Sequence, residues 1–292
     1  YVLYREERKK LRQQEAPQQE QNEGINIKID AEDEDGLDIK HLEVVVTEAC
    51  EGLEGTDAKQ IIDEANKNLY DGVTEEDART SLVMTSRTLV EQEPNYTYVT
   101  ARILLDNIRT EALTYLGMQK KATLKDMETL YPLALKSFLE RGVENEILNP
   151  ELLEMDIEKL GSAIDSHKDT NFTYLGLQTL YDRYFIHDTD VRYELPQVFF
   201  MRVSMGLALR EEKREDRAIE FYNLLSSFDY MSSTPTLFNS GTQHSQLSSC
   251  YLTTVPDDLH GIYGAIQDNA MLSKWAGGLG NDWTPVRGLG SQ

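Results

Sequence analysis

One of the chain's two cysteines, Cys250, lies in the segment whose residues could do chemistry. Ser248 and Ser249 precede it, and the run Ser233–Gly241 adds hydroxyls and turn-forming residues with little charge. A thiol among hydroxyl donors can act as a redox or nucleophilic group, and redox cycling to a disulfide needs a second cysteine. Cys50, in the amphipathic segment Glu43–Glu54, is a poor partner and is expected in the core. On residue chemistry alone, a small buried side chain remains the favoured interpretation of Cys250.

A glycine run, Gly277-Gly278-Leu279-Gly280, follows the next predicted helix. Backbone amides exposed by adjacent glycines can approach an anion or a ligand closely. The run lacks the Gly-Lys-Ser/Thr ending of a phosphate-binding loop, and it follows a helix rather than a strand, unlike a dinucleotide fingerprint. A helix end with a flexible loop is an equally good interpretation.

Asp257, Lys274 and Arg287 surround the same predicted helix. One carboxylate that accepts from a ribose and two cations that pair with phosphates form a nucleotide-binding set. Asp257 taken alone is better explained as the cap of the helix that follows it. Lys274 at the helix end also suits the helix dipole.

The composition excludes several classes of protein. A net charge of −22 disfavours nucleic acid and anionic membranes as partners, because both require surplus Lys and Arg. No apolar run reaches the roughly 20 residues that span a bilayer. Two distant cysteines form neither a disulfide framework nor a zinc site, so no metal and a reducing cytoplasm are expected. Because the chain starts at Tyr1 and ends without a signal, we expect part of a longer polypeptide.

The hydrophobic periodicity predicts a mainly helical chain. Tyr1–Leu11 resembles the end of a helix, Gln13–Gly24 a polar linker and Ile25–Ile29 a short strand. Helices are predicted over Asp57–Leu69, Thr74–Glu91, Tyr98–Tyr115, Leu124–Arg141, Asn149 to about Ser166, Thr173–Phe185, Leu195–Arg210 and Arg214–Phe228.

The composition changes after Phe228. Strands are predicted over Tyr230–Leu237 and Ser249–Val255, followed by a helix over Asp257–Trp275. The glycine loop and a short strand near Arg287 complete the chain. This order is typical of the beginning of an α/β domain.

Several long motifs in order resemble the large (α) subunit of class I ribonucleoside-diphosphate reductase. They are the runs 194–202 (Glu-Leu-Pro-Gln-Val-Phe-Phe-Met-Arg), 233–241 (Ser-Thr-Pro-Thr-Leu-Phe-Asn-Ser-Gly), 246–250 (Gln-Leu-Ser-Ser-Cys), 261–263 (Gly-Ile-Tyr) and 272–278 (Leu-Ser-Lys-Trp-Ala-Gly-Gly). The resemblance covers nearly the whole chain and is densest from about Leu177 onward.

The resemblance implies replacement of the ribose 2′-hydroxyl of a nucleoside diphosphate by hydrogen, through thiyl-radical chemistry. Cys250 matches the first member of the redox cysteine pair, Thr234 and Ser249 match substrate contacts, and Gly277 and Gly278 match the loop beside the substrate. The resemblance further implies that the effector dNTP of the specificity site, at an α–α dimer interface, is held by Asp257, Lys274 and Arg287.

The family also implies cofactors and partners. A metal-containing small (β) subunit supplies the radical, thioredoxin or glutaredoxin supplies electrons, and dNTP and ATP act as effectors of an α dimer or higher oligomer. The second redox cysteine and the radical cysteine have no counterpart in this chain, so we expect it to be inactive alone.

Residues 25–117 resemble the ATP-cone, the family's regulatory nucleotide module, without its basic Lys-Arg-x-Gly opening. Acidic residues occur there instead, in the range 30–35, and a family lysine falls near Thr110. Like charges repel a triphosphate, so a degenerate cone that does not bind ATP is expected. Residues 1–24 would be the end of a preceding cone and a linker, 118–229 the helical N-terminal domain and 230–292 the start of the α/β barrel.

Two other functions are compatible with the residues. One is a non-catalytic helical interaction module, and the other is a nucleotide-sensing regulatory module that works alone. The residues that follow Gln292 would distinguish the interaction module from the enzyme, because only the enzyme requires further cysteines. Calorimetry with dTTP and with ATP would test the nucleotide-sensing module.

Overall fold

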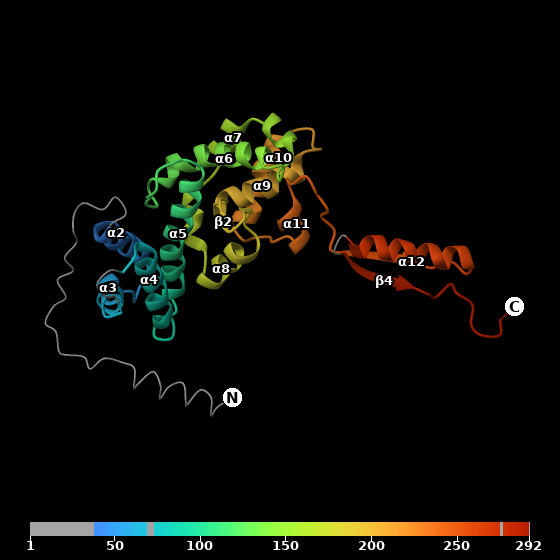
Figure 1. The fold of residues 1–292 in the computed structure, drawn as a ribbon, viewed down its shortest axis with the longest axis horizontal. Coiled ribbons are helices and arrows are strands. Elements are labelled where there is room, and N and C mark those ends of the chain that lie inside the picture. The colour runs from blue at the N-terminus through green and yellow to red at the C-terminus, as the bar shows by residue number, and fades with distance from the viewer. Residues whose placement is uncertain (1–37, 69–72, 275–276, 292) are drawn as a thin grey trace, which may run out of the picture.

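The computed structural model describes residues 38–68, 73–274 and 277–291 (Figure 1). The described residues are mainly helical, with two small sheets. The predicted helix at 1–11, the strand at 25–29, the acidic residues at 30–35 and the ends of two predicted helices, at Leu69 and Trp275, lie outside this range. Among the helices described, none combines the length and apolar character that a bilayer-spanning segment needs.

The first part of the structure is a group of four helices, α2 to α5. Their bounds are α2 Ile39–Cys50, α3 Ala58–Asn66, α4 Glu75–Leu89 and α5 Tyr96–Tyr115. Local capping explains where three of them begin: the side chains of Asp38, Asp57 and Thr74 each accept a backbone N–H from the first turn. The helix start predicted at Thr74 is confirmed, and the Asp77 amide donates to the Thr74 hydroxyl at 3.1 Å.

The second part continues the helical body. It contains α6 Met127–Glu144, η1 Pro150–Glu154, α7 Ile157–Ser162, η2 Ser166–Asn171, α8 Tyr174–Arg183, β1 His187–Asp188, β2 Val191–Arg192, α9 Pro196–Ala208 and α10 Arg214–Ser226. One buried apolar core runs from Leu42 to Leu237 through both parts. Helix α9 lies deep in this core, since nearly all of its residues are buried.

The single helix predicted from Asn149 to about Ser166 is wrong. Asn149 does cap a helix, through a 2.9 Å contact from the Glu151 amide, but that helix is a short 3₁₀ segment. Met155 then adopts an extended conformation, and Asp156 and Asp165 each cap a new short helix. Asp side chains favour such restarts because they compete for nearby backbone amides.

The third part extends away from the helical body toward the C-terminus (Figure 1). It follows α11 Thr234–Asn239 and consists of β3 Cys250–Thr254, α12 Leu259–Lys274 and β4 Gly278–Asp282. Strands β3 and β4 pair in parallel, so α12 is the crossover helix of a β–α–β unit. The prediction of a strand at 249–255 and of the helix after it is confirmed for the described residues.

Three predictions about this region are wrong. Residues 234–239 form helix α11 rather than a strand, because Pro235 in the first turn favours a helix start after the extended Ser233. Gly278–Asp282 form strand β4 rather than a loop, since β3 supplies backbone partners along its whole length. Arg287 lies beyond a turn closed by the Val286 amide on Trp283 O at 3.0 Å, not in a strand.

Candidate functional site

Cys250 opens strand β3 and is exposed, with its thiol free. Gly278 lies opposite it in the parallel pair, and the Gly278 amide donates to the Ser249 carbonyl at 2.9 Å. A Cβ at Gly278 would come 3.5 Å from the Cys250 sulfur. A Cβ at the preceding Gly277 would come 2.5 Å from the Tyr251 ring. The missing side chain at Gly278 therefore leaves the thiol uncovered on this side, and the missing side chain at Gly277 makes room for the Tyr251 ring.

Helix α11 is tied to the segment that leads into Cys250. The Asn239 side-chain amide donates to Gln246 O at 2.7 Å, and the Thr236 hydroxyl donates to Leu247 O at 3.2 Å. Thr234 is exposed at the start of the helix, with its hydroxyl 3.0 Å from the Tyr184 hydroxyl. The sequence-predicted Thr234, Ser249 and Cys250 thus belong to one connected segment with several exposed hydroxyls and one thiol.

The predicted nucleotide set is only partly assembled. Arg287 donates to the Asp257 carboxylate twice, from its backbone amide at 3.1 Å and from Nε at 2.7 Å. These two hydrogen bonds, the backbone one first, hold the pKa of Asp257 below its usual value. Lys274 ends α12, a helix of 16 residues that starts just after Asp257, so roughly 24 Å of helix separates them. The structure therefore brings Asp257 and Arg287 together and puts Lys274 at the other end of α12.

The capping role considered for Asp257 falls to its neighbour. The Asp258 carboxylate accepts the Gly261 amide at 2.8 Å, in the first turn of α12. Asp257 remains available for the partner 30 positions away.

Sequence reasoning missed three residues around α11. Tyr184 contacts Thr234 and stacks on Phe238, with 4.7 Å between the ring centroids. Glu194 and Arg202 form an ion pair with no exposed side-chain surface on either partner. The available signal was the presence of two charged residues in the mostly apolar run 193–203, because charged side chains are seldom fully buried unless they are paired.

At one end of the α2–α5 group, charged side chains are paired with one another. Arg79, which is 5% exposed, contacts Glu75, the Asp106 carboxylate at 3.0 Å and the Thr110 hydroxyl. His41 approaches the other Asp106 oxygen at 2.8 Å. The cation nearest to Thr110 is thus already engaged by carboxylates and a hydroxyl.

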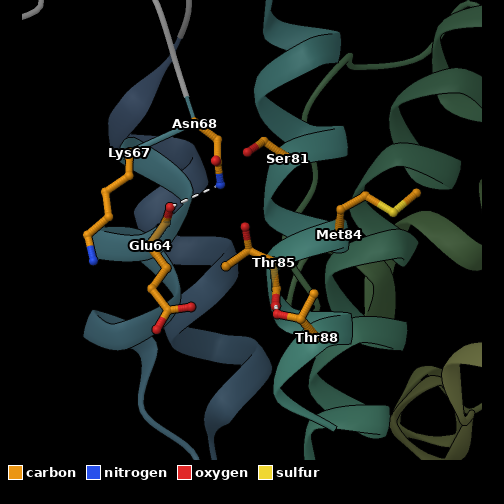
Figure 2. A pocket seen from close by; sticks show the side chains of 7 residues that line it. All are labelled: Glu64, Lys67, Asn68, Ser81, Met84, Thr85 and Thr88. Atoms are coloured by element: carbon orange, nitrogen blue, oxygen red, sulfur yellow. Dashed lines mark hydrogen bonds between the residues drawn. The ribbon is translucent and has the colours of Figure 1, made fainter. Parts of the chain in front are cut away.

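An open depression lies between α3 and α4, far along the chain from Cys250 (Figure 2). Two of its polar side chains bond locally, Asn68 to Glu64 O at 3.2 Å and Thr88 to Thr85 O at 2.7 Å. None of the residues expected to bind substrate or effector lines it. Within residues 38–68, 73–274 and 277–291, no group of three or more His, Cys, Asp or Glu comes together as a metal site would require.

Part of the sequence matches two protein-family models, and the whole sequence is similar to known proteins. Residues 170–245 match the family described as ribonucleotide reductase, all-alpha domain, and residues 248–292 match ribonucleotide reductase, barrel domain. Over its whole length the chain is 45% identical to ribonucleoside-diphosphate reductase subunit alpha of Chlamydia muridarum. The chain is a homologue of ribonucleoside-diphosphate reductase large subunits.

More distant reductases align over most of the chain. Ribonucleoside-diphosphate reductase subunit alpha of Helicobacter pylori is 34% identical over 87% of the chain. The large subunit of Danio rerio is 34% identical over 84% of it. The chain spans 28% of the length of the Chlamydia muridarum reductase and about 30% of the other two.

The candidate site residues fall in two different matched ranges. Thr234 and all of α11 fall in the all-alpha match. Ser249, Cys250 and the β3–α12–β4 unit, with Asp257 and Arg287, fall in the barrel match.

Proposed function

We propose that this chain is the N-terminal portion of a ribonucleotide reductase large subunit and that Cys250 is one member of its redox-active cysteine pair. The observation that carries the proposal is an exposed thiol at the start of the first barrel strand, with only hydrogen on the facing Gly278. A thiol in such an open position can approach a bound sugar.

The proposed reaction replaces a ribose 2′-hydroxyl by hydrogen. The C2′–O bond breaks and the oxygen leaves as water, while a new C2′–H bond forms. Two thiols supply the two electrons and two protons and become a disulfide, which thioredoxin or glutaredoxin then reduces. The partner thiol and the radical cysteine belong to other parts of the longer polypeptide, because Cys50 lies on α2.

Substrate contacts are proposed for Thr234, Ser249, Gly277 and Gly278 around the thiol. Hydroxyls of Thr234 and Ser249 supply donors and acceptors for the sugar and phosphates, and the glycines let the ligand come close to the backbone. Holding the sugar against the thiol in one orientation is the main contribution that such contacts make to the rate.

The effector dNTP is proposed to bind at Asp257 and Arg287. The guanidinium suits phosphate and the carboxylate suits a sugar hydroxyl, and their mutual contact of 2.7 Å holds both in place before a ligand arrives. Lys274 is retained as a third effector contact, reached from the other end of α12 or from a second subunit of an α dimer.

The α2–α5 group is proposed to be a degenerate ATP-cone that does not bind ATP. The support is the engagement of Arg79 by Glu75, Asp106 and Thr110, which leaves its charge neutralised. The relatives named subunit alpha imply a beta subunit as partner, which would deliver the radical. A cytoplasmic location fits the need for reduced thiols.

The test is the substitution Cys250→Ser in the full-length protein, with Cys50→Ser as the matched control. Cys250→Ser should abolish repeated turnover of nucleoside diphosphate with thioredoxin while effector binding stays unchanged. Cys50→Ser should turn over like the unchanged protein. Retained turnover of Cys250→Ser with the protein reductant would refute the redox role.

A further inference from the structure

The ion pair between Glu194 and Arg202 is buried completely. Arg202 Nε lies 2.8 Å from one carboxylate oxygen of Glu194, and Nη2 lies 3.1 Å from the other. The second oxygen also accepts the Ile186 amide at 2.9 Å. Burying such a pair gains little over packing apolar side chains, because both charges lose their water. Stability alone is therefore a weak explanation for this buried pair, which joins Arg202 of α9 to Glu194 just before the helix.

The remaining terminal nitrogen of Arg202 reaches another element. Nη1 donates to the carbonyls of Leu237 at 3.0 Å, Phe238 at 3.3 Å and Ser240 at 2.8 Å. These carbonyls belong to the end of α11, where the helix has no partners of its own for them. Glu194 fixes the plane of the guanidinium, and the guanidinium then caps α11.

The turn after α11 sits tightly on α9. A Cβ at Gly206 of α9 would come 2.1 Å from the Gly241 nitrogen, and Gly241 has φ +78°. The Ser240 hydroxyl donates to Val203 O at 2.7 Å. Residues 206 and 241 are glycines, so the two backbones can approach closely, and the Ser240 hydroxyl bonds across the contact. Together these features favour one position of α11 on α9.

Hydrogen bonds also connect α11 to the segment that precedes the Cys250 thiol. The Asn239 and Thr236 side chains donate to the carbonyls of Gln246 and Leu247, four and three residues before Cys250. At its other end α11 carries Thr234. A shift of α11 would thus move a proposed substrate contact and the approach to the thiol together.

We infer that Arg202, held by Glu194, is a positioning residue that sets α11 relative to Cys250 and so orients the substrate. The inference rests on the proposed function for its kinetic part only, because the seating of α11 can be measured without substrate. Arg202 itself touches backbone carbonyls and Glu194, so it acts through α11.

The test is Arg202→Lys in the full-length protein. Lysine keeps the charge but lacks the planar fork, so it cannot hold Glu194 and the α11 carbonyls at once. Hydrogen exchange of the backbone amides at 237–242 should become about tenfold faster or more, because their local opening is no longer opposed. The KM for the nucleoside diphosphate should rise about tenfold with a smaller change in kcat, and effector affinity should stay unchanged.

Two matched controls separate positioning from general damage. Arg109→Lys alters another buried pair, with Asp169 at 3.3 Å, on α5, and Arg210→Lys alters an exposed pair with Glu151 at 2.8 Å. Arg109→Lys should lower the melting temperature without raising the exchange rate at 237–242 or the KM. Arg210→Lys should leave the exchange rate and the KM unchanged. If Arg202→Lys does not fold, Glu194→Gln provides the same readouts, because it weakens the two contacts that hold the Arg202 guanidinium and leaves Arg202 in place.

The outcomes are distinct. Unchanged exchange at 237–242 in Arg202→Lys, or in Glu194→Gln if that variant must be used, would overturn the positioning role. An equal rise in KM in Arg109→Lys would overturn it as well. If instead Cys250→Ser turns over normally while exchange at 237–242 still rises in Arg202→Lys, the proposed function fails and the seating of α11 by Arg202 stands.

Discussion

Gly278 faces Cys250 across the parallel β3–β4 pair, and a Cβ at Gly278 would lie 3.5 Å from the Cys250 sulfur and 3.3 Å from the Ser249 carbonyl. A side chain at residue 278 would therefore lie in van der Waals contact with the thiol and cover part of it. A strand position filled by glycine weakens a sheet, so its benefit here lies in close approach to the neighbouring thiol.

Gly278→Val should therefore shield the thiol while leaving the strand able to form, because valine is a good strand former. We expect slower alkylation of Cys250 by iodoacetamide and lost turnover in the full-length protein. Cys50, which lies on α2, provides the internal control and should be alkylated as before. Unchanged Cys250 alkylation in a folded Gly278→Val protein would contradict an approach path over Gly278.

The two cysteines should differ in their reaction with alkylating agents. Burial raises the pKa of the Cys50 thiol, so its reactive thiolate is scarcer at a given pH. At pH 8 we expect the exposed Cys250 to be modified first, and the rate at Cys50 should still be climbing above pH 9. Mass spectrometry of peptides after timed labelling measures both rates, and equal rates at pH 8 would show that the burial of Cys50 does not control its reactivity.

The Asp257–Arg287 pair should depend on pH in one direction. The pKa of Asp257 is lowered from its ordinary 3.8 by the two hydrogen bonds from Arg287. Because the folded state then holds the proton less tightly than the unfolded state, the pair contributes at neutral pH and is lost as the pH falls below the ordinary value. The amide of Arg287, followed by nuclear magnetic resonance, should keep its position down to about pH 4 and shift below it.

Substitution tests the same pair at neutral pH. Asp257→Asn should loosen Arg287 and weaken binding of the effector dNTP in the full-length protein. Asp258→Asn is the matched control, because asparagine is also a good helix cap and should leave α12 and effector affinity unchanged. Equal effector affinity in both variants would argue against an effector site at Asp257.

Gly206→Ala should lower the free energy of unfolding by about 1–3 kcal/mol, because its Cβ has no room against the Gly241 backbone. Gly264→Ala on α12 is the matched control, since nothing lies within 4 Å of its Cβ. Alanine there should stabilise the helix by about 0.5–1 kcal/mol. Urea unfolding of both variants measures these changes, and an unaffected Gly206→Ala protein would show that α11 can be seated in another way.

ATP should find no site in the α2–α5 group. We expect Arg79→Ala to leave the calorimetric ATP titration unchanged in the full-length protein carrying Arg287→Ala, which weakens the proposed effector site. Any ATP that this protein still binds would then be held outside the α2–α5 group. The same variant titrated with dTTP shows how far the effector site has been weakened. Saturable ATP binding that is lost when Arg79 is changed to Ala would contradict the degenerate-cone proposal.

Features that depend on neighbouring residues along the chain could be predicted from the residue order. The helices around Thr74, Thr173 and Arg214, strand β3 and helix α12 were predictable, because caps and hydrophobic periodicity act within a few residues. The same local signals failed after Asn149, where the helix start was predicted correctly but only a short 3₁₀ helix follows.

Only the tertiary structure decided which distant groups meet. Strand β4 exists because β3 supplies its hydrogen bonds, and Arg287 finds Asp257 30 positions away because the β–α–β unit folds back on itself. Arg202 is a charged residue in an apolar run until α11 brings three carbonyls to its guanidinium. Such pairings depend on how the elements pack, and no local pattern of residue types specifies that packing.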